Sequence, residues 1–260
     1  MLVCGIDVGA RSAEVVLLDT GAPNDFTWRI TDTGHHPART GRRLFDEALG
    51  ERGASPGDVA CTIATGYGRA SLDFATQTVT EITCHARGVR RLLPDARTIV
   101  DIGGQDSKVI VLDDEGAVTD FAMNDRCAAG TGRFLEMIAR LLELDVGELA
   151  TVAGEAERPA EISSMCAVFG ETEAIGLLSR GTPRADVVAG VHASVASRIA
   201  ALASRLMVRP PGVFTGGVAT NAAMVAALET ALHMPLAVPP EPQITGALGA
   251  ALIAAERAAT

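Results

Sequence analysis

The stretch "ARTIVDIGGQDSKVIVLDDEG" (residues 96–116) has the pattern of a strand, an Asp-x-Gly turn that contains Asp101, and a second strand. It repeats the pattern of "LVCGIDVGARSAEVVLLD" (residues 2–19), where Asp7 occupies the same place in the turn. In both stretches Ile or Val flanks the Asp and alternating apolar residues follow the turn. A duplicated strand–turn–strand unit indicates a protein built from two similar halves.

Other segments extend this pattern along the chain. The stretch "VACTIATGYG" (residues 59–68) reads as a buried strand that ends in a glycine turn. The stretch "GVFTGGVATN" (residues 212–221) reads as a strand that passes through a glycine turn into a helix. Helical spacing of apolar residues predicts further helices in residues 33–53, 81–93, the stretch after Pro183, and 244–260.

The composition agrees with an α/β fold. Hydrophobic residues make up 48% of the 260 residues but aromatic residues only 3%, so Ala, Val, Leu and Ile must build the core. Such a core favours helices packed closely on sheets. With a net charge of −10 and a pI near 5.0, the chain lacks the excess of positive charge that binds nucleic acid or an anionic membrane surface.

The sequence predicts a protein of the reducing cytoplasm. "MLVCGIDVGA" lacks the basic start of a signal peptide, and Asp7 interrupts its apolar run. No uncharged apolar stretch of about 18 residues is present, so we expect no membrane span. The five cysteines are odd in number and lack the spacing of a secreted disulfide framework.

The two Asp-x-Gly turns are candidates for phosphate binding. Exposed backbone amides in such a turn can bind phosphate oxygens, and the carboxylate can hold Mg²⁺ through its water shell. One turn of this kind is usually an ordinary hairpin, but two in duplicated halves favour the functional interpretation. Gly216 and Gly217 add a third element, because they allow a backbone to approach a nucleotide at a helix start. The sequence contains neither a Walker motif nor a Rossmann glycine motif after a strand.

This order of motifs resembles the superfamily of acetate and sugar kinases, heat-shock chaperones and actin. The resemblance implies two ribonuclease-H-like halves with an ATP·Mg²⁺ cleft between them. It predicts a first half over residues 1–93, joined by a C-terminal helix over 245–260, and a second half over 94–244. It also implies two phosphate loops and an adenosine loop: Asp7, Gly9, Ala10, Arg11 and Ser12; Asp101, Gly103, Gly104 and Gln105; and Gly216, Gly217, Val218 and Asn221.

The cysteines fall into two groups. Cys4 and Cys61 lie in apolar strands and read as small buried hydrophobic residues. Cys84 stands beside His85, but no third catalytic partner is visible, which favours a structural role. Cys127 and Cys166 each precede a predicted helix, with Asn124, Asp125, Ser163 and Ser164 nearby as capping-type residues.

A helix start favours thiolate at Cys127 and Cys166. From the residues alone, two chemical interpretations of this pair stay open. They can be buried caps, or they can be ligands of a metal centre. A zinc ion and a four-iron cluster both require four ligands, and one chain offers only these two good candidates. A twofold dimer would supply four.

The strings "DIGGQDSKVI", "NDRCAAGTGRFLE", "SSMCAVFGETE" and "TGGVATN", in this order, resemble the activators of 2-hydroxyacyl-CoA dehydratases, in the BadF/BadG/BcrA/BcrD ATPase family. The resemblance implies a homodimer, or a pair of homologous subunits, that shares one 4Fe-4S cluster through Cys127 and Cys166. It implies ATP hydrolysis that passes an electron from a ferredoxin or flavodoxin to a dehydratase. Asp7 and Asp101 would handle Mg²⁺, and Gln105 and Asp106 are candidates for orienting the attacking water.

Three alternatives remain at this stage. An ATPase subunit of a benzoyl-CoA-reductase-type or other iron–sulfur reductase would share every motif. A small-molecule kinase of the same fold would phosphorylate an added hydroxyl substrate and hold no iron. A nucleotide-sensing regulator would bind ATP without turnover. The last two leave Cys127 and Cys166 as passive caps.

Overall fold

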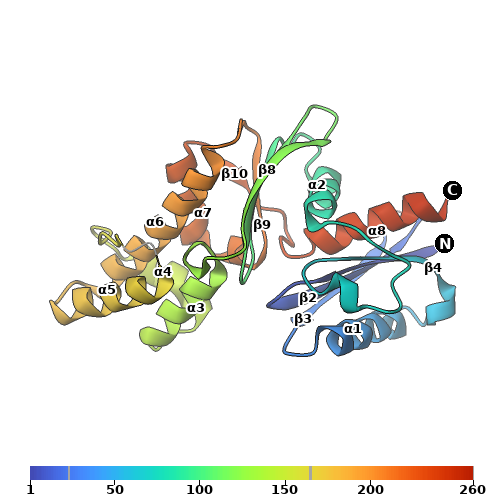
Figure 1. Cartoon of the computed structure of the whole chain (residues 1–260), viewed down its shortest axis with the longest axis horizontal. Helices are drawn as coiled ribbons and strands as arrows, with labels where there is room; N and C mark the ends of the chain where they lie inside the picture. Colours follow the sequence, from blue (N-terminus) through green and yellow to red (C-terminus); the bar gives the residue numbers. More distant parts are fainter. Residues whose placement is uncertain (23, 164–165, 260) are drawn as a thin grey trace. The chain divides into compact units, whose positions relative to one another are not determined.

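The structure is a computed structural model that describes residues 1–22, 24–163 and 166–259. The chain forms two compact units. The first unit contains residues 1–96, 112–118 and 239–260, and the second contains residues 97–111 and 119–238. Each unit carries a five-stranded sheet covered by helices (Figure 1).

The sheet of the first unit has the strand order β3-β2-β1-β4-β5. Strands β1 and β2 are antiparallel, as are β2 and β3, whereas β1, β4 and β5 run parallel. Side chains alternate between the faces of a sheet, and both faces are covered here, so β1, β2 and β4 are apolar almost throughout. The bounds are β1 Leu2–Val8, β2 Ser12–Asp19, β3 Phe26–Asp32, β4 Val59–Thr65 and β5 Gln77–Thr78.

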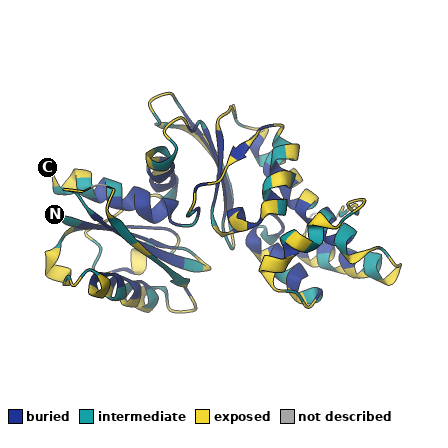
Figure 2. Cartoon of the chain, turned by 180° about the vertical axis from the view of Figure 1, so that it is seen from behind, coloured by how far each residue is buried: buried dark blue, intermediate teal, exposed yellow. Residues whose placement is uncertain are grey.

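Helices α1 Pro37–Glu51 and α8 Thr245–Ala258 cover this sheet, and α2 Glu81–Leu92 packs against α8. Helix α1 packs with Ile6 and Leu17 on one face, and α8 packs with Val3 and Leu18 on the other. Figure 2 shows how thoroughly α8 is buried. A Cβ on Gly249 would lie only 1.7 Å from the carbonyl oxygen of Cys84, so the small residues of α8 permit its close packing against α2.

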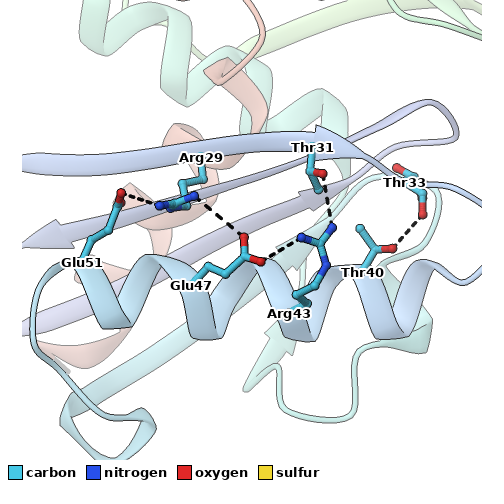
Figure 3. Close-up of polar contacts among 7 residues, drawn as sticks. All are labelled: Arg29, Thr31, Thr33, Thr40, Arg43, Glu47 and Glu51. Atoms are coloured by element: carbon cyan, nitrogen blue, oxygen red, sulfur yellow. Dashed lines mark hydrogen bonds and ion pairs between the residues drawn. The ribbon is translucent and has the colours of Figure 1, made fainter.

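Polar contacts attach α1 to the edge strand β3 (Figure 3). Arg29 pairs with Glu51 at 2.5 Å and with Glu47 at 3.8 Å, and Glu47 also accepts from Arg43 at 2.8 Å. The Thr40 hydroxyl donates to the carbonyl of Thr33 at 2.8 Å. These charged side chains are partly exposed, so each pair contributes little stability alone. Together they fix the helix along the strand, and Thr33 connects them to the functional site.

The sheet of the second unit has the order β10-β9-β6-β7-β8. Strand β6 is antiparallel to β7 and parallel to β9, which is parallel to β10. This arrangement matches that of the first sheet strand for strand, which confirms the two similar halves predicted from the Asp-x-Gly repeat. The bounds are β6 Thr98–Ile102, β7 Ser107–Leu112, β8 Val118–Asn124, β9 Gly212–Thr215 and β10 Leu236–Ala237.

In the described part of the second unit, five α-helices accompany the sheet: α3 Gly132–Leu141, α4 Leu149–Gly154, α5 Ala167–Ser179, α6 Arg184–Ala203 and α7 Ala222–Leu232. One cluster of buried residues joins these helices to β6 and β9. Among the described helices, α6 alone is long and apolar enough to cross a bilayer, but Val188, Val191, Val195 and Ile199 bury one side of it in this core. We therefore interpret α6 as a core helix.

Candidate functional site

The first Asp-x-Gly turn joins β1 to β2 in the first unit. The amide of Gly9 donates to the carbonyl of Ser12 at 2.9 Å and closes the turn around Ala10 and Arg11. The Thr33 hydroxyl donates to the carbonyl of Gly9 at 2.8 Å, and the Thr33 amide donates to the carbonyl of Arg11 at 2.9 Å. The turn is thus held from β3, and Arg11 reaches Asp32 at 3.1 Å on the surface.

Asp7 lies at the end of β1 and is only 7% exposed. Glycine backbone surrounds its carboxylate: a Cβ on Gly66 would lie 2.2 Å from Oδ1, and one on Gly246 would lie 2.0 Å from Oδ2. Gly246 is the second residue of α8, so the positive end of that helix favours the ionised carboxylate. The C-terminal helix α8 therefore packs over Asp7 and helps to bury it.

The second Asp-x-Gly turn joins β6 to β7 in the second unit. Asp101 is 3% exposed and both of its carboxylate oxygens are engaged. Lys108 donates to Oδ2 at 3.0 Å, and the Thr215 hydroxyl donates to Oδ1 at 2.8 Å. Lys108 also pairs with Asp106 at 2.6 Å. Lys108 was not predicted from the sequence, although a single charge within the apolar strand "SKVIVL" was the signal for it.

The chain bends sharply after Asp101. The Gly103 amide donates to the carbonyl of Asp106 at 3.0 Å, and a Cβ on Gly103 would lie 2.7 Å from Asp106 Oδ1. Gln105 is exposed at the tip of this turn, and Gly104 is half-buried beside it. The turn therefore presents backbone and the Gln105 side chain, while Asp106 is held towards Lys108.

The glycine loop after β9 packs directly on Asp101. Gly216 has a φ of +86°, and a Cβ there would lie 2.4 Å from the carbonyl oxygen of Ile102 and 3.0 Å from Asp101 Oδ1. Gly217 and Val218 begin a 3-10 turn, Gly217–Thr220, that leads to Asn221. The second unit thus brings together its Asp-x-Gly turn and the glycine loop, two of the three elements predicted to bind nucleotide.

Asn221 caps α7 and takes part in a buried hydrogen-bond chain. Its Oδ1 accepts from the amide of Met224 at 3.0 Å, and its Nδ2 lies 3.0 Å from His192 Nε2. His192 Nδ1 lies 2.8 Å from the carbonyl oxygen of Val188. Burial lowers the pKa of His192, which favours the neutral ring that donates to Val188 and accepts from Asn221. His192 was not predicted from the sequence, because helical spacing alone marks it only as a core position.

The first turn of α3 is attached to the second Asp-x-Gly turn. The amides of Gly132 and Arg133 each donate at 2.9 Å, to the carbonyls of Gly103 and Gly104 respectively. Helix starts have amides without intrahelical partners, and here the candidate phosphate loop accepts two of them. These two hydrogen bonds attach the start of α3 to the loop.

Cys127 lies five residues before α3. It is the N-cap of the 3-10 turn Ala128–Gly130, and Thr131 is the N-cap of α3, so Cys127 precedes the helix, as expected, with a turn between them. Asn124 fixes the cysteine backbone: its Oδ1 accepts from the Cys127 amide at 3.1 Å, and its Nδ2 donates to the Cys127 carbonyl at 2.8 Å. Asp125 is exposed and contacts Arg126.

Cys166 is the N-cap of α5, as expected, and is exposed. Ser163 donates to Glu173 of α5 at 2.8 Å, while Ser164 lies outside the described residues. The 3-10 turn after Cys127 contacts α5, and Gly170 of α5 packs on the ring of Phe134. The two cysteine-bearing segments therefore belong to one packed region of the second unit.

The remaining cysteines are buried, as predicted. Cys4, Cys61 and Cys84 are 0%, 5% and 0% exposed. Burial raises the pKa of Cys84 to about 12 and raises the pKa of Cys4 still further above its ordinary value. His85 bonds to the Thr245 hydroxyl at 3.0 Å, in a buried position near the start of α8. These features favour the structural role expected for the three thiols.

Two sheets of matching strand order, each with an Asp-x-Gly turn after its central strand, define the fold of the actin and sugar-kinase superfamily. A glucokinase of the ROK family from Streptomyces griseus shares this fold at 14% identity and a TM-score of 0.60. The chain belongs to the BadF/BadG/BcrA/BcrD ATPase family, which it matches over residues 4–254.

Relatives in this family match essentially the whole chain. The activator of lactoyl-CoA dehydratase from Anaerotignum propionicum is 47% identical and covers 99% of both chains. The activator of the 2-hydroxyisocaproyl-CoA dehydratase from Clostridium difficile, solved with bound ADPNP, is 41% identical with a TM-score of 0.92, over 100% of this chain and 96% of that one. One subunit of the benzoyl-CoA reductase from Thauera aromatica is 34% identical over 98% of this chain and 94% of its own length.

Proposed function

We propose that this chain is an ATP-dependent activator that delivers a low-potential electron to a 2-hydroxyacyl-CoA dehydratase. Family membership and the names of its relatives support the ATPase activity and the class of partner enzyme. The observation that carries the proposal is the attachment of α3 to the second Asp-x-Gly turn, through the amides of Gly132 and Arg133. It joins the loop that we propose to bind phosphate to the segment that begins at Cys127.

The nucleotide part of the proposal rests on three glycine-lined loops. The amides around Gly9–Ser12, Gly103–Gly104 and Gly216–Val218 would bind the nucleotide, because a side chain on Gly103 or Gly216 would collide with neighbouring atoms. Asp7 and Asp101 would hold Mg²⁺ through its waters. Lys108 and Thr215 already engage Asp101, which fixes its carboxylate before any ligand arrives. Gln105 and Asp106 are our candidates for orienting the attacking water.

Asn221 has a different proposed role from the loop backbone. Its Oδ1 caps α7 and its Nδ2 faces His192. We propose that it acts beside the adenosine by shaping the Gly216–Thr220 loop, so that the backbone of this loop forms the adenosine contacts. His192 then acts through Asn221 as a positioning residue.

Cys127 and Cys166 would hold a 4Fe-4S cluster shared by two copies of the chain. Among the described residues no three His, Cys, Asp or Glu side chains gather into a metal site, so the two thiols of one chain need those of another to complete four ligands. Cys166 is exposed, and beside it α5 exposes Val168 (62%), Phe169 (68%) and Ile175 (45%). An exposed apolar face of this kind fits a homodimer interface.

When bound, the cluster supplies a one-electron carrier of low potential. A reduced ferredoxin or flavodoxin would load it. ATP can promote docking on the dehydratase only if it binds the docked conformation more tightly than the resting one. The hydrogen bonds between Gly103–Gly104 and the start of α3 provide the route by which nucleotide contacts would move the Cys127 segment. We place this activity in the reducing cytoplasm, where free thiols persist.

Iron content and absorbance of the anaerobically purified protein test the cluster. We expect about four irons per dimer and an absorption band at about 400 nm, typical of a 4Fe-4S centre. Cys127→Ser and Cys166→Ser should each lose the chromophore and still bind ATP. The matched variants Cys4→Ser, Cys61→Ser and Cys84→Ser should keep it. About four irons on each monomer would refute the shared site, and an iron-free dimer that phosphorylates an added hydroxyl substrate would refute the activator.

The relative from Thauera aromatica favours a second candidate function, the ATPase subunit of a benzoyl-CoA-reductase-type enzyme. Both candidates share the ATPase and the cluster and differ only in the partner that accepts the electron. Reconstitution of the reduced protein with each partner enzyme separates them. Dehydration of a 2-hydroxyacyl-CoA supports the first candidate, and ATP-dependent ring reduction supports the second.

A further inference from the structure

A cavity of about 240 Å³ lies within the second unit and is lined in part by the Cys127 segment. Its wall combines polar groups from β7, β8 and the region around the end of α6. The lining residues are Ser107, Asn124, Cys127, Gly130, Arg198, Ile199, Ala201, Leu202 and Arg205. At about 30 Å³ per water, the volume is far more than one water requires.

Ser107 is the first indication that the cavity receives a ligand. The residue is 0% exposed, and its hydroxyl has no hydrogen-bond partner within the described structure. A buried hydroxyl without a partner is costly. A Cβ on Gly130 would lie 3.7 Å from this hydroxyl, 3.2 Å from Asn124 Nδ2 and 3.9 Å from Arg198 Cβ. Side chains from three elements thus converge beside Gly130.

The charge of the wall is the second indication. Arg198 and Arg205 both line the cavity, and no Asp or Glu is among its lining residues, although the whole chain has a net charge of −10. Arg198 lies within α6, more than a turn before its end, and Arg205 follows the helix. The two guanidinium groups therefore reach the wall from different places along the chain, and the Ser107 hydroxyl lies in the same wall.

We propose that this cavity is a binding site for a phosphate group. Arg198 and Arg205 would supply charge-assisted hydrogen bonds, and the Ser107 hydroxyl would donate to the same ligand. Both ends of the Asn124 amide already bind the Cys127 backbone, so Asn124 forms part of the wall without bonding to the ligand. Through Ser107 the site adjoins the Asp101 turn, and it includes Cys127, the proposed cluster ligand, but none of the residues proposed to bind nucleotide. The phosphate group can be free inorganic phosphate or part of a small phosphate ester.

Equilibrium dialysis of the full-length protein with radiolabelled inorganic phosphate tests the site, with a non-hydrolysable ATP analogue and Mg²⁺ present to fill the nucleotide site. We expect one phosphate per chain beyond the analogue. The double variant Arg198→Gln/Arg205→Gln should weaken phosphate binding by about tenfold or more. Ser107→Ala should weaken it severalfold while raising the melting temperature of the ligand-free protein, because the unpaired hydroxyl is removed. Competition by glycerol phosphate distinguishes an ester from the free ion.

Arg126→Gln is the matched control, since Arg126 adjoins Cys127 but does not line the cavity. It should bind phosphate as the wild type does. Absence of phosphate binding would overturn the proposal, as would binding that the ATP analogue abolishes or that the double variant retains. Binding of the ATP analogue is measured in the same samples. A protein that binds phosphate but no nucleotide would therefore contradict the proposed function and leave the phosphate site intact.

Discussion

Replacing Lys108 with methionine should strongly destabilise the second unit. The Lys108 side chain is 3% exposed and the Asp101 carboxylate beside it is 4% exposed, at an Nζ–Oδ2 distance of 3.0 Å. Methionine keeps most of the volume and removes the charge, so the Asp101 carboxylate stays buried without the cation it faces. Removing one partner of a buried pair typically costs about 3–5 kcal/mol of unfolding free energy. Asp106 is 25% exposed and can turn towards water, so it adds little.

Chemical denaturation followed by circular dichroism measures this loss. Lys108→Met should lower the unfolding free energy by about 3–5 kcal/mol, and the double variant Lys108→Met/Asp101→Asn should recover much of it, because no charge is then left unpaired. Arg126→Gln is the control. Its side chain is 95% exposed and its contact with Asp125 is long, so it should cost under about 1 kcal/mol. A loss below about 1 kcal/mol for Lys108→Met would show that solvent reaches Asp101 and would refute the reasoning.

Three further predictions concern nucleotide, donor and pH. Asp101→Ala should reduce Mg²⁺-dependent ATP hydrolysis far more than it reduces the helical circular dichroism signal, and a wild-type rate of phosphate release would contradict the proposed role of Asp101. Charge reversal at Arg126 and Arg133, which flank Cys127, should slow cluster reduction by an acidic ferredoxin, most at low salt; stopped-flow rates that are equal at all ionic strengths would exclude this role. Burial lowers the pKa of His192 below its ordinary 6.5, so the unfolded chain binds the extra proton first and stability should fall as pH drops below about 6.5. His192→Gln should show a smaller loss of melting temperature from pH 7 to 5, and an identical loss would remove His192 as the cause.

Local patterns explain which parts of the fold could be predicted. The Asp-x-Gly repeat predicted both hairpins because each segment contains its own alternating apolar residues and its own glycine turn. Strand β3 was missed, because "FTWRITD" is a half-buried edge strand whose pattern is weak. Helical spacing also does not tell which face of a helix meets the core, and Ile175 of α5 is 45% exposed.

For the candidate site, the sequence predicted the glycine turns and their aspartates but not the side chains that contact them. Glycines and aspartates at turns are recognisable from the local sequence, whereas Thr215 and His192 acquire their roles from neighbours distant in the chain. Thr215 lies 114 positions from Asp101, and Asn221 lies 29 positions from His192. Thr131 has extended backbone angles (φ −138°, ψ 170°) and separates the 3-10 turn after Cys127 from α3.

The return of α8 to the first sheet has a consequence for synthesis on the ribosome. All residues of the second unit are translated before Thr245 is, and until then Val3, Val16 and Leu18 lack α8, the helix that packs on them. Domains generally fold as units while the chain emerges, so the later-numbered unit can mature first and the N-terminal sheet must wait. Translation pauses within residues 97–238 would prolong that exposure, and a chaperone that holds the N-terminal strands during this interval would raise the yield of active protein.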